Sequence, residues 1–136
     1  MLDFLHPKMS IDASPDIFVF STSKNQFSIE PIVYIDPENH KPVAMGENTG
    51  IPSNIIKVQL FKPQELLTQS FSKYQILTAF IGYGIGRSYM HILVPFPRPI
   101  VNLHGVDRFE PVLCGYQREF FFTAITEGGA WTVRFE

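Results

Sequence analysis

Residues 17–46 constrain the fold of this 136-residue chain most, because they contain three strand-like runs and almost nothing that favours a helix. The runs, 17–22, 27–36 and 42–46, are largely β-branched, aromatic or otherwise apolar. Polar turn-forming residues separate them at 23–26 and around 36–40. The pattern predicts a three-stranded antiparallel meander.

Within these runs, residues 17–20 are all apolar, which is typical of a strand in a sheet that is covered on both faces. Pro31 interrupts the second run. Because proline has no N–H to donate, Pro31 predicts a bulge or a position on the unpaired side of that strand. Residues 55–61 alternate apolar and polar side chains and predict a fourth, half-exposed strand or an extended crossing segment.

The first helix is predicted over residues 65–81, where apolar side chains recur at helical spacing on one face. Pro63 suits the first turn of such a helix. Gly82, Gly84 and Gly86 are expected to end it, because glycine readily adopts the left-handed cap conformation.

The second half of the chain predicts a strand, a helix and a last strand. Residues 89–95 read as a buried strand, and the prolines that follow exclude ordinary ladder pairing over 96–100. Asp107 can cap a second helix, which the glycines at 128–129 end. Residues 131–135 read as a terminal strand.

The element order is therefore β-β-β, a fourth possible β, and then α-β-α-β. A meander followed by two helix–strand units predicts an α/β fold with a mixed sheet and right-handed crossovers. No linker is long enough to separate two domains, so we expect residues 1–136 to form a single domain.

Composition excludes several classes of protein. Cys114 is the only cysteine, so neither an intramolecular disulfide nor a cysteine-based zinc site can form. The net charge of −2 leaves no basic surplus, so nucleic acid is not expected as a partner. The first residues do not read as a signal peptide, and the longest apolar stretch, 76–85, is too short to span a bilayer. We expect a cytoplasmic protein with no transmembrane segment.

No group of residues forms a strong catalytic signal. Asp12, Glu30 and Asp36 could hold Mg²⁺ only if they converged, and Glu30 and Asp36 are about 20 Å apart on an extended strand. Solvated charges or turn caps are the favoured interpretation. The four histidines have no metal-ligand spacing, and Cys114 is expected to be a small buried side chain and not a nucleophile. We expect no metal and no cofactor.

Phe120, Phe121 and Phe122 are consecutive on the second predicted helix and cover about 200° of its circumference. At least one ring should face outward or meet a second layer. Phe121 and Phe122 are therefore candidate interface anchors. The equal alternative is a helix that lies between the sheet and residues 1–9.

The proline-rich run 95–99 contains Phe96 and Arg98, two further interface candidates. Such a run can be a stiff extended docking segment. The favoured interpretation is a rigid connection between a strand and a helix.

Three strings resemble a known family. They are MSIDASPDIFVFS (9–21), FSIEPIVYIDPENHKPVAMGE (27–47) and NIIKVQLFKP (54–63). They resemble the first subdomain of the MreB-like bacterial actin homologues, the rod shape-determining proteins, in which similar segments read "EPSVVAID…GKVLAVGEEA" and "NIVAIRPLKDG". The resemblance implies an RNase-H-like β-β-β-α-β-α-β order. It also implies that HILVPFP (91–97) stands where the family has a strand ending in Val-Pro.

One departure from the family concerns nucleotide binding. Actin-like ATPases carry Asp-x-Gly-Thr near the first strand, and its backbone amides hold phosphate. The aligned residues here are Asp12, Ala13, Ser14 and Pro15. Ser14 replaces the glycine that permits close backbone approach, and Pro15 removes an amide donor. Only Asp12 remains as a nucleotide-binding remnant, so we expect no ATP binding by this chain.

These features predict a non-catalytic, truncated actin-like module, not an enzyme. It would act through protein–protein contacts, with a protein partner or as a homo-oligomer, in cell-shape or cytoskeletal assembly. Two alternatives stay open. One is a small RNase-H-like hydrolase or nuclease that uses Asp12 and other carboxylates, and the other is a small ligand-binding domain with an aromatic pocket.

Overall fold

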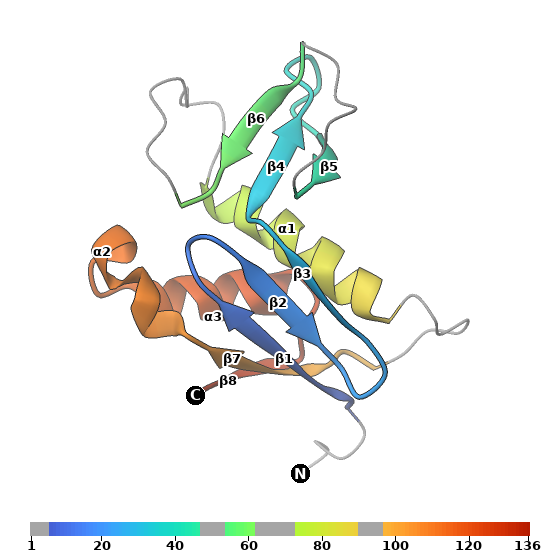
Figure 1. Ribbon diagram of the computed structural model, residues 1–136, viewed down its shortest axis with the longest axis vertical. Coiled ribbons are helices and arrows are strands. Elements are labelled where there is room, and N and C mark those ends of the chain that lie inside the picture. Colours follow the sequence, from blue (N-terminus) through green and yellow to red (C-terminus); the bar gives the residue numbers. More distant parts are fainter. Residues whose placement is uncertain (1–5, 47–53, 62–72, 90–96) are drawn as a thin grey trace.

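The computed structural model describes residues 6–46, 54–61, 73–89 and 97–136. Its largest element is a five-stranded mixed sheet with two helices packed on one face (Figure 1). The α/β class and the mixed sheet are therefore as predicted. The strands follow the spatial order β3 (Gln26–Ile29), β2 (Phe18–Ser21), β1 (Lys8–Ala13), β7 (Ile100–His104) and β8 (Thr132–Phe135).

The central strand β1 was not predicted as a strand. Residues 8–13 alternate between exposed and buried side chains, with Met9, Ile11 and Ala13 in the core. This is the pattern of a strand with one face on the core, but it is only six residues long and lies beside a polar segment. β1 is antiparallel to β2 and parallel to β7, so it joins the two halves of the sheet.

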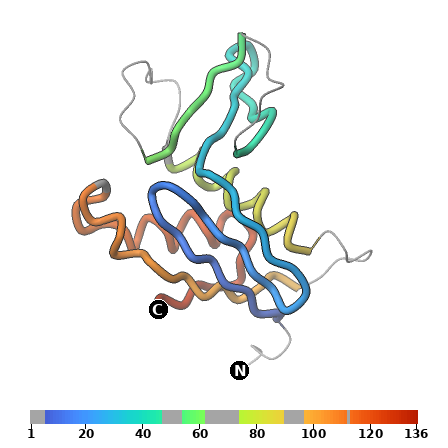
Figure 2. Tube along the Cα trace, in the orientation of Figure 1, coloured from blue at the N-terminus to red at the C-terminus, as the bar shows by residue number. Residues whose placement is uncertain are grey.

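The predicted meander is wrong at its second strand, which divides at Glu30-Pro31. β3 ends at Ile29 in the large sheet, and β4 (Ile32–Ile35) begins a second sheet of three strands. Pro31 has no N–H for a ladder, and the N–H of Ile32 donates back to the carbonyl of Glu30 at 2.7 Å. Figure 2 shows the chain passing from one sheet into the other at this place.

The small sheet has the order β5-β4-β6 and is antiparallel throughout. β5 (Pro42–Met45) is the last strand of the predicted meander, and β6 (Ile56–Gln59) is the predicted fourth strand. The small sheet and the large sheet share one core, because Val33 and Val58 belong to the same buried cluster as Phe18 and Phe20.

The first helix, α1 (Lys73–Ser88), extends beyond its predicted end. The three glycines that were expected to cap it lie inside it. A Cβ at Gly84 would come within 2.2 Å of the Phe20 ring, so glycine there allows α1 to lie close against β2. Residues 65–72 of the predicted helix lie outside the described residues.

The second predicted helix is divided into three pieces. A 3₁₀ turn (Val106–Phe109) leads into α2 (Glu110–Leu113), and α3 (Gln117–Glu127) follows. Cys114 and Gly115 separate α2 from α3 because both have left-handed backbone conformations, with φ of 51° and 93°. α3 ends before Gly128, as predicted.

β7 lies directly after the proline-rich run 95–99, in a segment where no strand was predicted. All of the predicted strand 89–95 except Tyr89 lies outside the described residues. β8 agrees with the predicted terminal strand. Among the described residues, helices cover only one face of the large sheet, and the double cover expected from residues 17–20 is not seen there.

Candidate functional site

The carboxyl ends of β1 and β7 lie side by side in the large sheet, with Asp12 opposite His104. The chain leaves β1 toward β2 on one side, and β8 lies beyond β7 on the other side. Open α/β sheets bind ligands at such a point, where the strand order changes direction. This point is therefore the candidate functional site.

Arg108 lies across the candidate site. Its Nη1 donates to Oδ1 of Asp12 at 2.6 Å and to the carbonyl oxygen of Ala13 at 3.1 Å. The side chains of Arg108 and Asp12 are 53% and 54% exposed, so water screens their attraction. Asp12, which the sequence analysis identified as a remnant of a nucleotide site, is thus paired with Arg108 of the same chain.

Gly105 makes this approach sterically possible. Its φ is +90°, and a Cβ there would come within 2.4 Å of the Ala13 carbonyl oxygen and 2.7 Å of Arg108 Nη1. The N–H of Arg108 donates to the Gly105 carbonyl at 3.0 Å, which closes a turn directly after β7. Sequence reasoning missed Gly105 and Arg108, because it placed the strand before the prolines and read this segment as a helix start.

The turn between β1 and β2 uses its own amide groups. The N–H of Ser14 donates to the carbonyl of Ile17 at 3.0 Å, and the N–H of Ile17 donates to Ser14 Oγ at 3.2 Å. Pro15 has no N–H. Two amides of this turn therefore take part in hydrogen bonds within the turn, and Pro15 supplies none.

Comparison with solved structures finds MreB 5 of Spiroplasma citri in two states. The structure bound to AMPPNP matches with a TM-score of 0.65 and 16% sequence identity over 96% of this chain. The structure bound to ADP matches with a TM-score of 0.62 and 15% identity over the same share. The chain has the fold of one part of MreB5. At this identity the likeness to MreB5 concerns the fold alone.

The chain spans only 38% of the MreB5 chain in each match. No protein-family model matches the sequence, and no curated protein matches it. The resemblance to MreB-like proteins is confirmed at the level of the fold. Residues 91–96 of the string aligned with the Val-Pro strand lie outside the described residues, and the first described strand after α1 is β7.

The aromatic interface candidates Phe121 and Phe122 differ in how far they are buried. Phe121 is fully buried, with its ring centroid 4.7 Å from that of Phe109, so it cannot meet a partner in this fold. The interpretation of Phe121 as an interface anchor is therefore wrong. Phe122, one position later, is 43% exposed. Phe96 lies outside the described residues, and the exposed Arg98 donates from Nη2 to the Thr126 carbonyl at 2.9 Å.

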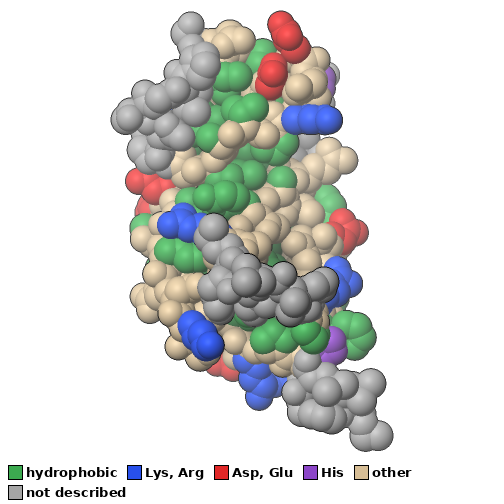
Figure 3. Space-filling model, turned by 90° about the vertical axis from the view of Figure 1, so that its right-hand side faces the viewer, with side chains coloured by type: hydrophobic (Ala, Val, Ile, Leu, Met, Phe, Trp, Pro, Cys, Tyr) green, Lys and Arg blue, Asp and Glu red, His purple; other side chains and the backbone are tan. Residues whose placement is uncertain are grey.

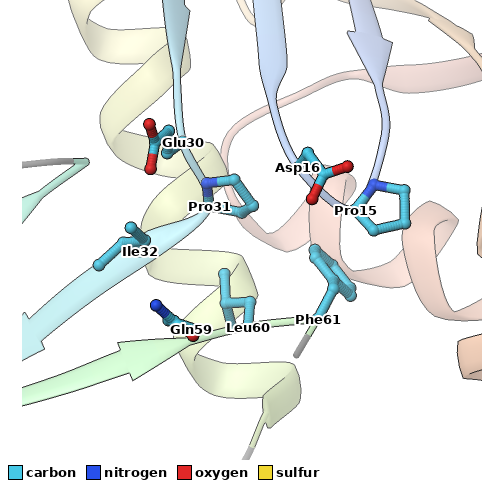
Figure 4. A pocket seen from close by; sticks show the side chains of 8 residues that line it. All are labelled: Pro15, Asp16, Glu30, Pro31, Ile32, Gln59, Leu60 and Phe61. Carbon is cyan, nitrogen blue, oxygen red and sulfur yellow. The ribbon is translucent and has the colours of Figure 1, made fainter. Parts of the chain in front are cut away.

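The suggested carboxylate cluster does not form. Among the described residues, no three histidine, cysteine, aspartate or glutamate side chains lie close enough together to hold a metal ion. Asp16 and Glu30 border a hollow of about 20 Å³ where the β1–β2 turn meets the start of β4 and the end of β6, room for about one water (Figure 4). In Figure 4 the Glu30 carboxylate points away from Asp16.

Cys114 also differs from expectation, since it is exposed and not buried. It occupies the left-handed corner between α2 and α3.

On the face that Figure 3 shows, basic and acidic side chains are interspersed and neither forms a continuous field. Among the described helices, none is both long and apolar enough to cross a membrane.

Proposed function

We propose that this chain is a non-catalytic actin-like module that acts through contacts with other protein, in cell-shape or cytoskeletal assembly in the cytoplasm. The observation that carries the proposal is the pairing of Arg108 with Asp12 beside a β1–β2 turn whose amides are already used. A nucleotide phosphate at this point would need free amide donors and an open approach.

The likeness to MreB5 supports the second half of the proposal. The two solved structures are of MreB5 bound to AMPPNP and to ADP. This chain shares the fold of part of that protein, but it replaces the features that would hold phosphate in an actin-like ATPase. A retained fold with an altered turn favours protein contacts over nucleotide binding as the role of this chain.

Isothermal titration of the full chain with Mg·ATP and Mg·ADP tests the proposal. We expect no binding heat at nucleotide concentrations up to about 1 mM. A dissociation constant of about 1 mM would correspond to a binding free energy of roughly −4 kcal/mol. Arg108→Ala should also show no heat, because removing the guanidinium does not supply the missing amides. A micromolar affinity for ATP that Asp12→Ala abolishes would overturn the proposal.

The nuclease alternative has no supporting observation among the described residues. Metal-assisted hydrolysis needs several carboxylates around one ion, and Asp12 has an arginine beside it instead. We expect no cleavage of single-stranded or double-stranded nucleic acid in the presence of Mg²⁺ or Mn²⁺. Cleavage that Asp12→Asn abolishes would favour the nuclease.

A further inference from the structure

β8 is an edge strand of the large sheet (Figure 1). It pairs with β7 on one side, and no described strand pairs with its other side. The N–H of Glu136, directly after β8, donates to the Leu103 carbonyl of β7 at 2.9 Å. Because backbone groups alternate in direction along a strand, Val133 and Phe135 turn their N–H and C=O groups toward the open side. Such groups can pair with an extended segment of another chain.

α3 has two flanks, and α1 packs against one of them. Phe120 lies on that flank, where its ring centroid is 6.1 Å from that of Tyr74 of α1. Arg118 lies on the other flank, with its guanidinium 5.2 Å from the centroid of the half-buried Phe135 ring of β8. Phe122 follows Arg118 by one helical turn and is 43% exposed. Arg118 and Phe122 therefore stand beside the open side of β8.

The charge of Arg118 has no acidic partner within the described part of the chain, where no carboxylate forms an ion pair with it. Its contact there is with the Phe135 ring. A guanidinium that lies over a ring still has N–H donors for a carboxylate, since it carries five. Arg118 is also exposed, so a partner can reach it. An acidic side chain is the complement of this position.

The spacing of Arg118 and Phe122 matches the spacing of side chains on an added strand. α3 connects the parallel strands β7 and β8, so its axis runs roughly along β8. Residues four apart on a helix are separated by a rise of about 6 Å. Side chains two residues apart on a strand share a face and are about 6.8 Å apart. An extended segment beside β8 can therefore present an acidic side chain to Arg118 and, two residues away, an apolar side chain to Phe122.

The opposite edge strand, β3, has a similar arginine but less room. The guanidinium of Arg87 of α1 lies 4.2 Å from the centroid of the Phe27 ring of β3. The small sheet crowds the end of β3, because a Cβ at Gly46, directly after β5, would come within 2.7 Å of the Ile29 side chain. β8 is therefore the more open edge, and Arg87 is a matched control for Arg118.

We propose that the open side of β8 binds an extended acidic segment of a partner protein, which becomes a sixth strand of the large sheet. A carboxylate of the segment lies at Arg118, and an apolar side chain two residues away lies at Phe122. The binding rests on the proposed function, since it names the kind of partner for a module that acts through protein contacts. A segment this short binds weakly, with Kd of roughly 0.1–1 mM.

Two-dimensional NMR of the ¹⁵N-labelled full chain tests the binding. The probes are the capped peptide Thr-Thr-Asp-Thr-Leu-Thr-Thr and its reverse, Thr-Thr-Leu-Thr-Asp-Thr-Thr, because the spacing fits a strand of either direction. We expect at least one peptide to bind with Kd at or below about 1 mM and to shift the amide signals of Val133 and Phe135 most. No saturable shift with either peptide up to about 5 mM, or largest shifts away from β8, would overturn the proposal.

Arg118→Glu should weaken binding of the tighter peptide by at least about tenfold, because it brings like charges together. The same peptide with Lys in place of Asp should bind this variant with the wild-type Kd to within about threefold. Arg87→Glu is the matched control and should leave Kd unchanged to within about twofold. Unchanged binding to Arg118→Glu, no recovery with the Lys peptide, or an equal loss in Arg87→Glu would each overturn the proposal.

Phe122→Ser tests the apolar contact separately and should weaken binding by at least about threefold. Circular dichroism checks that the variants remain folded, which we expect because the three side chains are exposed. A folded Phe122→Ser that binds the peptide as the wild type does would also overturn the proposal.

The nucleotide titration separates this proposal from the proposed function. A chain that binds neither the peptides nor ATP overturns only the binding at β8 and leaves protein contacts to another surface. ATP binding that depends on Asp12 overturns the proposed function, whatever the peptides do.

Discussion

Among single residues, Phe121 and Phe122 show how one step along a helix separates a core residue from a surface residue. Phe121 is fully buried, and its ring lies within 6.3 Å, between centroids, of Phe18, Phe61 and Phe109. Phe122 leaves nearly half of its surface in water. The two positions therefore form a matched pair for a stability experiment.

We expect Phe121→Ala to lower the free energy of unfolding by about 3–5 kcal/mol, because it removes a buried ring and leaves a cavity. Phe122→Ala should cost less than about 1 kcal/mol. Urea unfolding monitored by circular dichroism measures both, at a protein concentration low enough to keep the chain monomeric. Equal losses in the two variants would contradict the assigned burial.

Among the elements, α1 contains two glycines with opposite surroundings. Gly84 faces the Phe20 ring, whereas a Cβ at Gly86 would meet no atom within 4 Å. Gly84→Ala should destabilise the protein by about 1–3 kcal/mol, because the added methyl group forces α1 and β2 apart.

Gly86→Ala is the control for this helix and should stabilise the protein by about 0.5–1 kcal/mol, since alanine is the better helix former. Thermal unfolding of the two variants gives shifts of opposite sign. A stabilising Gly84→Ala would show that α1 does not lie against β2 as described.

Tyr74 joins α1 to α3, because its hydroxyl donates to Oε2 of Glu127. This hydrogen bond, together with burial and the negative charge of Glu127, raises the pKa of Tyr74 above its ordinary value of 10.0. A raised pKa in the folded state means that the contribution to stability is complete below pH 10 and is lost as the pH rises through the folded pKa.

The stability difference between the wild type and Tyr74→Phe should therefore shrink between pH 8 and about pH 11. Urea unfolding of both proteins at the two pH values measures this difference. The comparison removes the titration of other tyrosines and lysines, which both proteins share. A difference that does not change with pH would show that the Tyr74–Glu127 hydrogen bond is absent in solution.

The elements also show which sequence signals were sufficient. β2, β6 and β8 were predicted because their apolar residues alternate or cluster beside clear turn residues. Pro31 was recognised as a disturbance, but one chain position cannot show whether a strand bends or changes sheet. Gly84 was misread as a helix end because its role depends on Phe20, which is 64 positions away in the sequence.

At the candidate site, sequence reasoning found Asp12 and the altered turn but not Arg108. The ion pair joins residues 96 positions apart, and no local pattern indicates such a contact. Asp12 and Arg108 are close only because β1 and β7 are neighbours in the folded sheet. Local chemistry was thus readable from the sequence, whereas partners across the sheet were not.

For the whole molecule, the shared core predicts a single cooperative unfolding transition. Val33 and Val58 of the small sheet belong to the same buried cluster as Phe18 of the large sheet. Trp131 fluorescence reports on the large sheet, and an NMR signal from Val58 reports on the small sheet. We expect coincident urea transitions from both probes. Separate midpoints would show that the small sheet unfolds independently.

The contact between Gly84 and Phe20 also has an evolutionary consequence. The space that the missing Cβ leaves is already filled by an aromatic ring from another element, so neither position can change its size alone. Among descendants of this sequence, a larger residue at 84 should appear only with a smaller residue at 20. Substitutions at the two positions would then occur together, so that the combined volume of the two side chains stays nearly constant.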